Sequence, residues 1–390
     1  MKIRLSDPVV VAMGPISAQS HWGPYQFPTL HHLEDGRLVY TFCDSADSEA
    51  AYNAELGCRV SADGGKTWTA ARERDFSDLL GIRATNGDLV RFEGLSSIPL
   101  ENVSLPEPIG CTALGHTIYR VEDLKNPTFP LTWRLYRRAD GEKSATLEDV
   151  TLNWPHMIVR STQGVFVPPS VRGRLRKAPD GTLWMPHYYL AGTDPESGEL
   201  IPYLCNYLFR STDCGRTWEL MHFLPYFPDG KLRQEHYEGY GENDVAFCPD
   251  GSMIRLIRLS SIAPCMLTRS ADDGKTWSEP QIFDTHGVWP CLLTLKCGVT
   301  LASYGRPGLT LRATDDPSCQ AWEVPIELIH APAFDQGGDL NSLEEVATCG
   351  YSSMIPLDDR TAALAYSNFT IRDRDGISHK CMMFRTVHID

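Results

Sequence analysis

The sequence lacks several features that would place it in familiar classes. No apolar run approaches the length of a membrane span, and no cleavage site follows the N-terminal residues. No C-x-x-C pair is present, and twelve cysteines are too sparse for a disulfide scaffold in a chain of 390 residues. We therefore expect mostly buried, reduced thiols, among them Cys58, Cys205, Cys248 and Cys291, and a cytoplasmic location. If a signal peptide had been removed, the same sequence would fit a secreted or periplasmic protein.

Positive charge is also scarce. Lys and Arg number 36 against 50 Asp and Glu, which gives a formal net charge of −14. Such a chain repels nucleic acids and anionic membranes, so we expect neither as a partner. An anionic substrate would need a locally positive pocket. No recognised metal-ligand spacing, phosphate loop or nucleotide fingerprint stands out, so we predict neither a metal nor a cofactor.

One turn sequence is present three times: SADGGKTW at 61–68, STDCGRTW at 211–218 and SADDGKTW at 270–277. Ser and Asp side chains bond to nearby backbone amides in such turns, and Gly adopts the left-handed conformation. Asp63, Asp213 and Asp272 could instead be metal ligands. A single carboxylate among small residues is a poor metal site, and the calcium-loop pattern is absent. We therefore interpret the repeats as structural turns, with decayed copies at 137–147 and 313–322.

A second repeat predicts the architecture. A turn leads into an apolar strand at 34–42, 86–92, 179–189, 249–259, 296–306 and 357–367. This pattern is typical of a β-hairpin. There are six such units, and in each complete unit the hairpin comes before the repeated turn. This order predicts an all-β fold, and six units predict a six-bladed β-propeller.

The repeats extend over nearly the whole chain, so we expect one domain, 1–390, with a long insertion or loops around 93–150. The sequence at 98–132 is rich in Pro and Leu and could form an extra hairpin. The first strand, 3–12, is expected to pair with 382–389, because either edge left open would invite aggregation.

These turns and the six-unit layout resemble the sialidase (neuraminidase) superfamily, whose Asp-box (BNR-repeat) propellers have six blades and a central active site. Asp boxes also occur in binding propellers and other glycosidases, so four further segments carry the functional resemblance. Segment 241–260 is similar to a family strand with the catalytic glutamate, which implies that role for Glu242 and carboxylate binding for Arg258. Segment 347–368 resembles the last-blade motif, which implies that Tyr351 is the nucleophile.

A phenol suits that role chemically. A sialic acid carries a carboxylate at its anomeric carbon, so an Asp or Glu nucleophile would meet like-charge repulsion. Tyrosine is neutral until a neighbouring base, here Glu242, takes its proton.

Segment 303–316 resembles the fifth-blade segment and implies that Arg306 is another carboxylate ligand. Arginine suits this task because its planar fork binds both carboxylate oxygens.

Segment 23–38 departs from the family. It lines up with the Phe/Tyr-Arg-Ile-Pro motif, whose arginine is central to substrate binding, but has Gln26 in that position. An amide can donate a hydrogen bond but has no charge. The cations that could replace the missing arginine are Arg83, Arg172, Arg174 and His21.

The family takes its general acid from a loop that corresponds here to 43–57, which offers Asp44, Asp47, Glu49 and Glu55. We select Asp47, with Glu49 as the next choice. His236, Glu238 and Tyr240 lie just before Glu242 and could line the same pocket.

Together these features predict a retaining, metal-independent exo-glycoside hydrolase that releases terminal sialic acid or a related acidic sugar from a glycan or glycoconjugate. Two alternatives stay open. One is a propeller glycosidase or lyase for another sugar, such as a uronate, a rhamnoside or an arabinan end. The other is a non-catalytic propeller that binds carbohydrate or protein.

Overall fold

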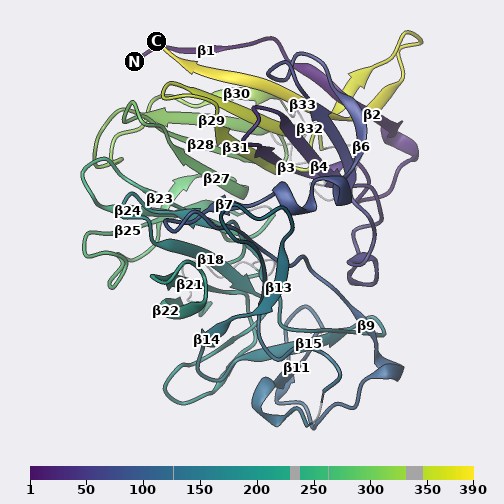
Figure 1. Ribbon diagram of the computed structural model, residues 1–390, viewed down its shortest axis with the longest axis vertical. Coiled ribbons are helices and arrows are strands. Elements are labelled where there is room, and N and C mark those ends of the chain that lie inside the picture. The colour runs from purple at the N-terminus through teal and green to yellow at the C-terminus, as the bar shows by residue number, and fades with distance from the viewer. Residues whose placement is uncertain (126, 229–237, 262, 331–345) are drawn as a thin grey trace.

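The computed structural model describes residues 1–125, 127–228, 238–261, 263–330 and 346–390. Most elements are antiparallel β-strands (Figure 1). The helices in these described ranges are short 3₁₀ turns: η1 (Ser17–Gln19), η2 (Glu49–Ala51), η3 (Glu73–Asp75), η4 (Ser77–Leu79), η5 (Leu100–Asn102) and η6 (Val121–Asp123).

Six sheets follow one another along the chain, and their strands pair in antiparallel order with one exception in the third sheet. The first contains β3 (Gln26–His32), β4 (Leu38–Cys43), β5 (Gly57–Ser61) and β6 (Thr69–Arg72). The second contains β7 (Ile82–Arg83), β8 (Leu89–Phe92), β12 (Arg134–Arg138) and β13 (Thr146–Asp149). The third contains β17 (Arg176–Lys177), β18 (Leu183–Tyr189), β21 (Cys205–Ser211) and β22 (Thr217–Leu224), with β14 (Thr151–Asn153) parallel to β22.

The later sheets repeat this order. The fourth contains β23 (Asn243–Phe247), β24 (Met253–Arg258), β25 (Cys265–Ser270) and β26 (Gln281–Asp284). The fifth contains β27 (Val288–Thr294), β28 (Thr300–Gly305), β29 (Leu309–Thr314) and β30 (Ile326–Ile329). The sixth contains β31 (Ser352–Pro356), β32 (Thr361–Arg372) and β33 (Ser378–Ile389), and β33 also pairs with β1 (Ile3–Leu5) and β2 (Val9–Ile16).

The pairing of the first and last strands is confirmed. Ile3 lies opposite Ile389 and Val9 lies opposite Phe384, both in antiparallel register. The two termini accordingly lie side by side in Figure 1. The N-terminal strands thus complete the sheet that the C-terminal segment begins.

The insertion is more ordered than the expected loops or single hairpin, and it extends past residue 150. A five-stranded sheet combines β9 (Ile98–Pro99), β10 (Gly110–Cys111) and β11 (Thr117–Arg120) with β15 (Ile158–Thr162) and β16 (Val165–Val167). The reason is apolar burial, since Tyr119 and Leu124 pack against Val159 and Phe166 from the later segment. A separate hairpin joins β19 (Gly192–Thr193) to β20 (Leu200–Ile201). Strands β9, β11 and β15 lie at the bottom of Figure 1.

The predicted hairpins form the turns between the first and second strands of all six sheets. Glycine occupies the left-handed position in five of these turns, with φ between 86° and 90° at Gly36, Gly87, Gly181, Gly251 and Gly298. A residue with a Cβ is disfavoured there, so these glycines fix the sharp reversal that the strands require.

The repeated Ser-x-Asp-x-Gly-x-Thr-Trp turns connect the third and fourth strands of their sheets. In the first, Asp63 Oδ1 accepts the backbone N–H groups of Lys66 and Thr67 at 3.0 and 2.9 Å, and Oδ2 accepts the Thr67 hydroxyl at 2.6 Å. The bond from the Thr67 hydroxyl, followed by those from the backbone, lowers the pKa of Asp63 to about 2. Asp213 and Asp272 accept the corresponding backbone bonds. These contacts support the structural interpretation of the turns.

The tryptophan that ends each turn packs against a neighbouring sheet, which is the preceding one along the chain for the later turns and the sixth sheet for Trp68. Ring centroids lie 5.3 Å apart for Trp68 and Phe384, 5.2 Å for Trp218 and Phe92, 5.9 Å for Trp277 and His222, and 5.1 Å for Trp322 and Phe283. The last pair belongs to the decayed copy at 313–322, where Cys319 adopts a φ of 51° in place of glycine. Each turn therefore braces two sheets against each other.

Buried apolar clusters fill the spaces between successive sheets. Separate clusters join the second sheet to the third, the third to the fourth, the fourth to the fifth and the fifth to the sixth. A further cluster packs Ala363 and Met382 of the sixth sheet on Leu30 and Tyr40 of the first. Along one side of this core, β23, β27, β31 and β3 contact one another in succession.

The bracing role of the turns predicts a large loss of stability in Trp218→Ala. Trp218 is 0% exposed, and its indole N–H donates to the Gly215 carbonyl at 3.0 Å. Truncation of a buried tryptophan to alanine is expected to lower the free energy of unfolding by about 3–5 kcal/mol. Urea denaturation measures this, with Val324→Ala, at an 81% exposed position, as the control that changes little. A loss below about 1 kcal/mol would contradict the bracing role.

Candidate active site

The residues selected from the sequence gather at one edge of the sheets. Gln26 begins β3, while Glu242 and Tyr351 directly precede β23 and β31. Arg258 ends β24, and Arg306 follows β28. First and second strands are antiparallel, so the start of one lies beside the end of the other. Because β23, β27, β31 and β3 contact in succession, these positions converge.

The carboxylate of Glu242 is the hub of this cluster. The Tyr351 hydroxyl donates a hydrogen bond to Oε1, and Arg258 Nη1 donates to the same oxygen at 2.7 Å. The backbone N–H of Trp289 donates to Oε2 at 3.1 Å. Glu242 is 4% exposed, so its carboxylate is buried, and both of its oxygens accept hydrogen bonds.

The electrostatics favour an ionised Glu242 and a protonated Tyr351. Burial alone would raise the pKa of Glu242, but Arg258 and the hydrogen bonds from Arg258 and Tyr351 outweigh it and hold that pKa below its usual value. Burial, and then the negative charge of Glu242, raise the pKa of the Tyr351 hydroxyl well above its usual value. The resting site therefore contains a carboxylate hydrogen-bonded to a neutral phenol.

Two aromatic rings hold Tyr351 in place. Trp289 stacks on it with centroids 4.9 Å apart and an interplanar angle of 15°, and Phe27 meets it edge-on at 4.7 Å and 70°. Both have positive φ, 45° at Trp289 and 56° at Phe27, which is unusual for bulky residues. Both also lie at register irregularities, where β27 and β3 each bulge just before a proline. Strained backbone of this kind is concentrated at functional sites.

Trp289 was missed by the sequence reasoning, although a signal was present. Its Trp-Pro pair opens the first strand of the fifth sheet just as Phe27-Pro28 opens that of the first. Arg174 supports this ring from 4.8 Å and donates to the carbonyls of Pro290, at 2.8 Å, and Ser352. Arg174 therefore contacts the ring that stacks on Tyr351 and the backbone beside it.

Arg306 is a buried cation without an acidic partner. Its side chain is 7% exposed and stacks on Trp22, with the guanidinium carbon 4.6 Å from the ring centroid. It donates to the Cys349 carbonyl at 3.2 and 3.0 Å and to the Ser261 hydroxyl at 3.1 Å, but forms no ion pair within the described ranges. Burial, reinforced by the charge of Arg258, lowers its pKa. A buried charge without an acidic partner is costly.

Gln26 is fully buried, at 0% exposed, and no described residue hydrogen-bonds its amide oxygen or nitrogen. Buried amides of this kind normally have partners. The neighbouring Phe27 packs against Tyr351, whereas the Gln26 amide forms no hydrogen bond with Arg258 or Arg306.

The two leading candidates for the general acid have different surroundings. Glu49 pairs with the buried Arg160 at 2.7 Å, so its carboxylate already has a partner within the protein. The Asp47 carboxylate forms no hydrogen bond with any described residue, and only its backbone N–H is bound, to the Trp22 carbonyl at 3.1 Å. Part of Asp47 faces solvent, yet nearby protein removes enough water to raise its pKa, against the opposing charges of Arg306 and Arg172. Of the two, Asp47 has the surroundings of a proton donor.

The remaining cations are divided between the site and its periphery. Arg83 pairs with Glu34 and has no contact with the cluster, and His21 contributes only a carbonyl, which accepts from Lys380 at 2.7 Å. Arg172 donates to the hydroxyls of Tyr52 and Tyr188, beside the acidic loop, and its charge acts on Asp47.

The segment before Glu242 contributes a second carboxylate. Glu238 pairs with Arg258 at 3.1 Å, and Tyr240 packs against Tyr226 in the adjacent core. His236 lies outside the described residues. Within the described ranges, no group of three or more His, Cys, Asp or Glu side chains is placed to hold a metal ion. The same ranges contain no helix that is long and apolar enough to cross a membrane.

No protein-family model and no curated protein matches the chain. Solved structures do. A protein of unknown function from Dyadobacter fermentans superposes with a TM-score of 0.62 at 20% identity, over 100% of this chain and 99% of that one. The Hadza microbial sialidase Hz136 gives 0.55 at 16% identity, over 97% of this chain and 68% of that one. An α-L-arabinofuranosidase from Fusarium graminearum gives 0.50 at 13% identity, over 97% of both chains. At these identities the similarity is one of fold.

The paired titration of Glu242 and Tyr351 leads to a prediction for Glu242→Gln. Removal of the carboxylate charge should lower the pKa of Tyr351 relative to wild type, while burial keeps it above the usual value. Carbon-13 NMR of tyrosine-labelled protein measures this, with the Tyr351 signal assigned through Tyr351→Phe. A Tyr351 pKa that stays unchanged or rises would show that the two groups are not electrostatically coupled.

Proposed function

We propose that the chain is a six-bladed β-propeller and a retaining exo-glycoside hydrolase that releases a terminal sialic acid or related acidic sugar. The observation that carries the proposal is the Tyr351 hydroxyl bonded to a buried, ionised Glu242. The packing of the sixth sheet on the first supports the propeller. The sialidase among the structural neighbours agrees with the proposed reaction class.

In the first step, the Tyr351 oxygen attacks the anomeric carbon while Glu242 accepts its proton. The bond to the leaving oxygen breaks, and Asp47 donates a proton to that oxygen. In the second step, water attacks the anomeric carbon and gives a proton to Asp47, while the bond between that carbon and the Tyr351 oxygen breaks. Tyr351 departs and recovers its proton from Glu242. Two displacements at one carbon retain its configuration.

The opposed pKa shifts explain why the proton moves only during reaction. Tyr351 holds its proton firmly and Glu242 is a weak base, so the resting enzyme contains no phenolate. As the new carbon–oxygen bond forms, the phenol oxygen donates a lone pair to the anomeric carbon, and its proton becomes acidic. Transfer to Glu242 can then accompany the attack, because the two groups are already in hydrogen-bond contact.

The acidic character of the sugar follows from Arg306. Arg306 lacks an acidic partner among the described residues, and Ser261 accepts a hydrogen bond from it and another from Arg258, which brings the two guanidinium groups together. A substrate carboxylate at this position would neutralise the uncompensated charge and accept bidentate hydrogen bonds. We propose Arg258 and Arg306 as its ligands, with Gln26 adding a neutral hydrogen bond.

A second candidate function is supported by Gln26. A buried amide with free donor and acceptor atoms suits a sugar hydroxyl, which would favour a glycosidase for a neutral sugar such as an arabinofuranoside. A panel of aryl glycosides separates the candidates, since an α-sialoside, a uronide, a rhamnoside and an arabinofuranoside differ in charge and ring. A binding protein without catalytic activity would turn over none of them.

The nucleophile assignment predicts that Tyr351→Phe loses turnover and keeps its fold. The phenylalanine ring still packs between Trp289 and Phe27, and only the attacking oxygen is absent. We expect kcat on an aryl sialoside to fall by about a thousandfold or more. The matched control is Tyr366→Phe, a buried tyrosine of the same sheet outside the cluster, which should keep wild-type kcat. Wild-type activity in Tyr351→Phe would mean that another group attacks.

The ligand assignments predict a graded series. Hydrogen bonds to a charged group contribute about 1.5–3 kcal/mol, so Arg306→Met should lower kcat/KM on an aryl sialoside roughly 10- to 150-fold. A neutral bond contributes about 0.5–1.5 kcal/mol, so Gln26→Ala should lower it about 2- to 10-fold. Gln26→Arg should also lower it, because a longer, charged side chain does not fit a closed pocket. Increased activity in Gln26→Arg, or no effect of Arg306→Met, would overturn the carboxylate assignment.

A further inference from the structure

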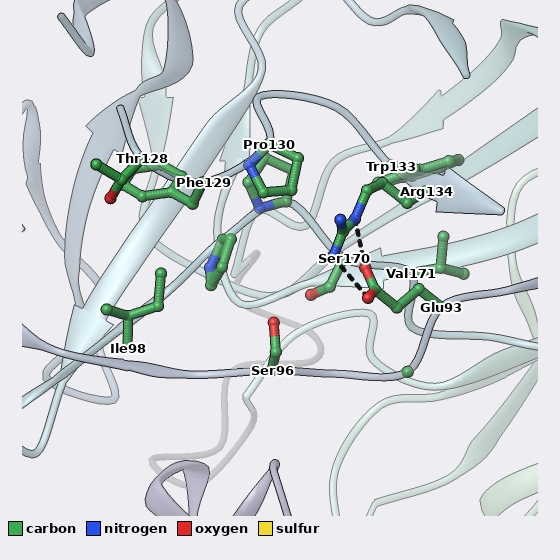
Figure 2. Close-up of a pocket in the computed structure, with 13 residues that line it drawn as sticks. Glu93, Ser96, Ile98, Thr128, Phe129, Pro130, Trp133, Arg134, Ser170 and Val171 are labelled. Carbon is green, nitrogen blue, oxygen red and sulfur yellow. Dashed lines mark hydrogen bonds and ion pairs between the residues drawn. The ribbon is translucent and has the colours of Figure 1, made fainter. Parts of the chain in front are cut away.

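A cavity of about 230 Å³ lies between the insertion sheet and the second sheet, away from the candidate active site (Figure 2). None of the residues proposed for the chemistry lines it. Its wall comes from three segments, which run from the end of β8 to β9, from Thr128 to the start of β12, and onward from the end of β16.

One buried polar group in this wall forms no hydrogen bond within the described part of the chain. It is the hydroxyl of Ser170, a residue that is only 8% exposed. An unsatisfied buried donor costs about 1–3 kcal/mol. Figure 2 shows the hydroxyls of Ser96 and Ser170 pointing into the space between the lining residues. The cavity therefore offers several hydrogen-bonding groups to a guest molecule.

The charges in the wall cancel. Arg134 binds Glu93 through two hydrogen bonds, of 2.7 and 2.6 Å, which occupies both carboxylate oxygens. Figure 2 shows this pair at one side of the cavity. Arg134, the cation of this wall, is thus neutralised by Glu93, so the cavity suits a neutral guest rather than an anion.

The apolar part of the wall complements these hydroxyls. Phe129, Pro130 and Ile98 face the cavity from the side opposite Trp133 and Arg134 in Figure 2. A sugar ring presents C–H groups on its faces and hydroxyls at its edge, so it requires this mixture of surfaces. The volume is below the roughly 300–1,000 Å³ of pockets for drug-sized ligands, which limits the guest to about one monosaccharide.

We propose that this cavity binds one neutral sugar unit. The binding site stands on the cavity alone, whereas its role as a subsite for a remote part of the glycan rests on the proposed function. Two links connect it with the acidic loop. Asn53 of that loop exchanges hydrogen bonds of 3.0 and 3.3 Å with the backbone of Ser97, beside Ser96. Ser170 precedes by two residues Arg172, which binds Tyr52.

Gly94 allows the cavity to be blocked without damage to the fold. It is exposed, its backbone φ lies outside the positive range, and a Cβ added there would have no atom within 4 Å. Gly94→Leu should therefore fill part of the cavity while Gly94→Ala, the matched control, leaves most of it open. Tyr351→Phe serves as a second control, because it alters only the candidate active site.

The test is saturation-transfer NMR with the methyl glycosides of galactose, mannose and N-acetylglucosamine as probes. We expect at least one to bind wild type, Gly94→Ala and Tyr351→Phe alike, and to bind Gly94→Leu at least about tenfold more weakly. Absence of binding by all three, or equal binding to Gly94→Leu, would overturn the sugar site. Displacement of the bound probe by methyl sialoside from wild type and Gly94→Ala alike would overturn its neutral character.

The same variants separate this proposal from the proposed function. If the probes bind as expected but wild type turns over no aryl glycoside, the sugar site stands and the hydrolase proposal fails. If turnover occurs and Gly94→Leu binds the probes as wild type does, the hydrolase proposal stands and the sugar site fails.

Discussion

The buried carboxylate of Glu242 is the interaction on which the rest of the site depends. Its two oxygens accept bonds from Arg258 of its own sheet, from the Trp289 amide of the fifth sheet and from the Tyr351 hydroxyl of the sixth. Burial of an isolated carboxylate would be prohibitive, so these donors are required for the charge to exist there. The same three bonds fix the relative positions of three sheets at the edge where the chemistry is proposed. One ionised side chain thus joins the fold to the proposed reaction.

The Glu242 carboxylate has its hydrogen-bond donors, but buried groups around it lack partners in the described ranges. Arg306 is buried without an acidic partner in the described ranges, and the Gln26 amide is buried without a hydrogen bond there. Phe27 and Trp289 maintain positive φ while they hold the Tyr351 ring. Each feature would be disfavoured in a core selected for stability alone, and together they surround one phenol. A ligand that supplied an anion and hydrogen-bond acceptors would relieve most of these costs at once.

Much of the fold could be read from the sequence, because local chemistry determines it. Glycine at the hairpin turns, aspartate in the repeated turns and the pairing of the first strand with the last all follow from short-range rules or from the need to cover a sheet edge. The insertion sheet could not be predicted, since its strands are short and its stability comes from apolar contacts between segments about forty residues apart. In the site, residues named by resemblance came together. Trp289 could have been found from its Trp-Pro pair, whereas the pairing of Glu49 with Arg160 depends on a tertiary contact that no spacing encodes.

The central claim is that the Tyr351 oxygen forms a covalent bond with the sugar. A fluorinated sialosyl fluoride tests it most directly, because the fluorine slows hydrolysis of the intermediate and lets it accumulate. Digestion and mass spectrometry of the treated protein should place one sialosyl group on the peptide that contains Tyr351, and the label should be absent from Tyr351→Phe. A label on Glu242, Asp47 or any other side chain, or turnover of the reagent without a trapped sugar on Tyr351, would contradict the account.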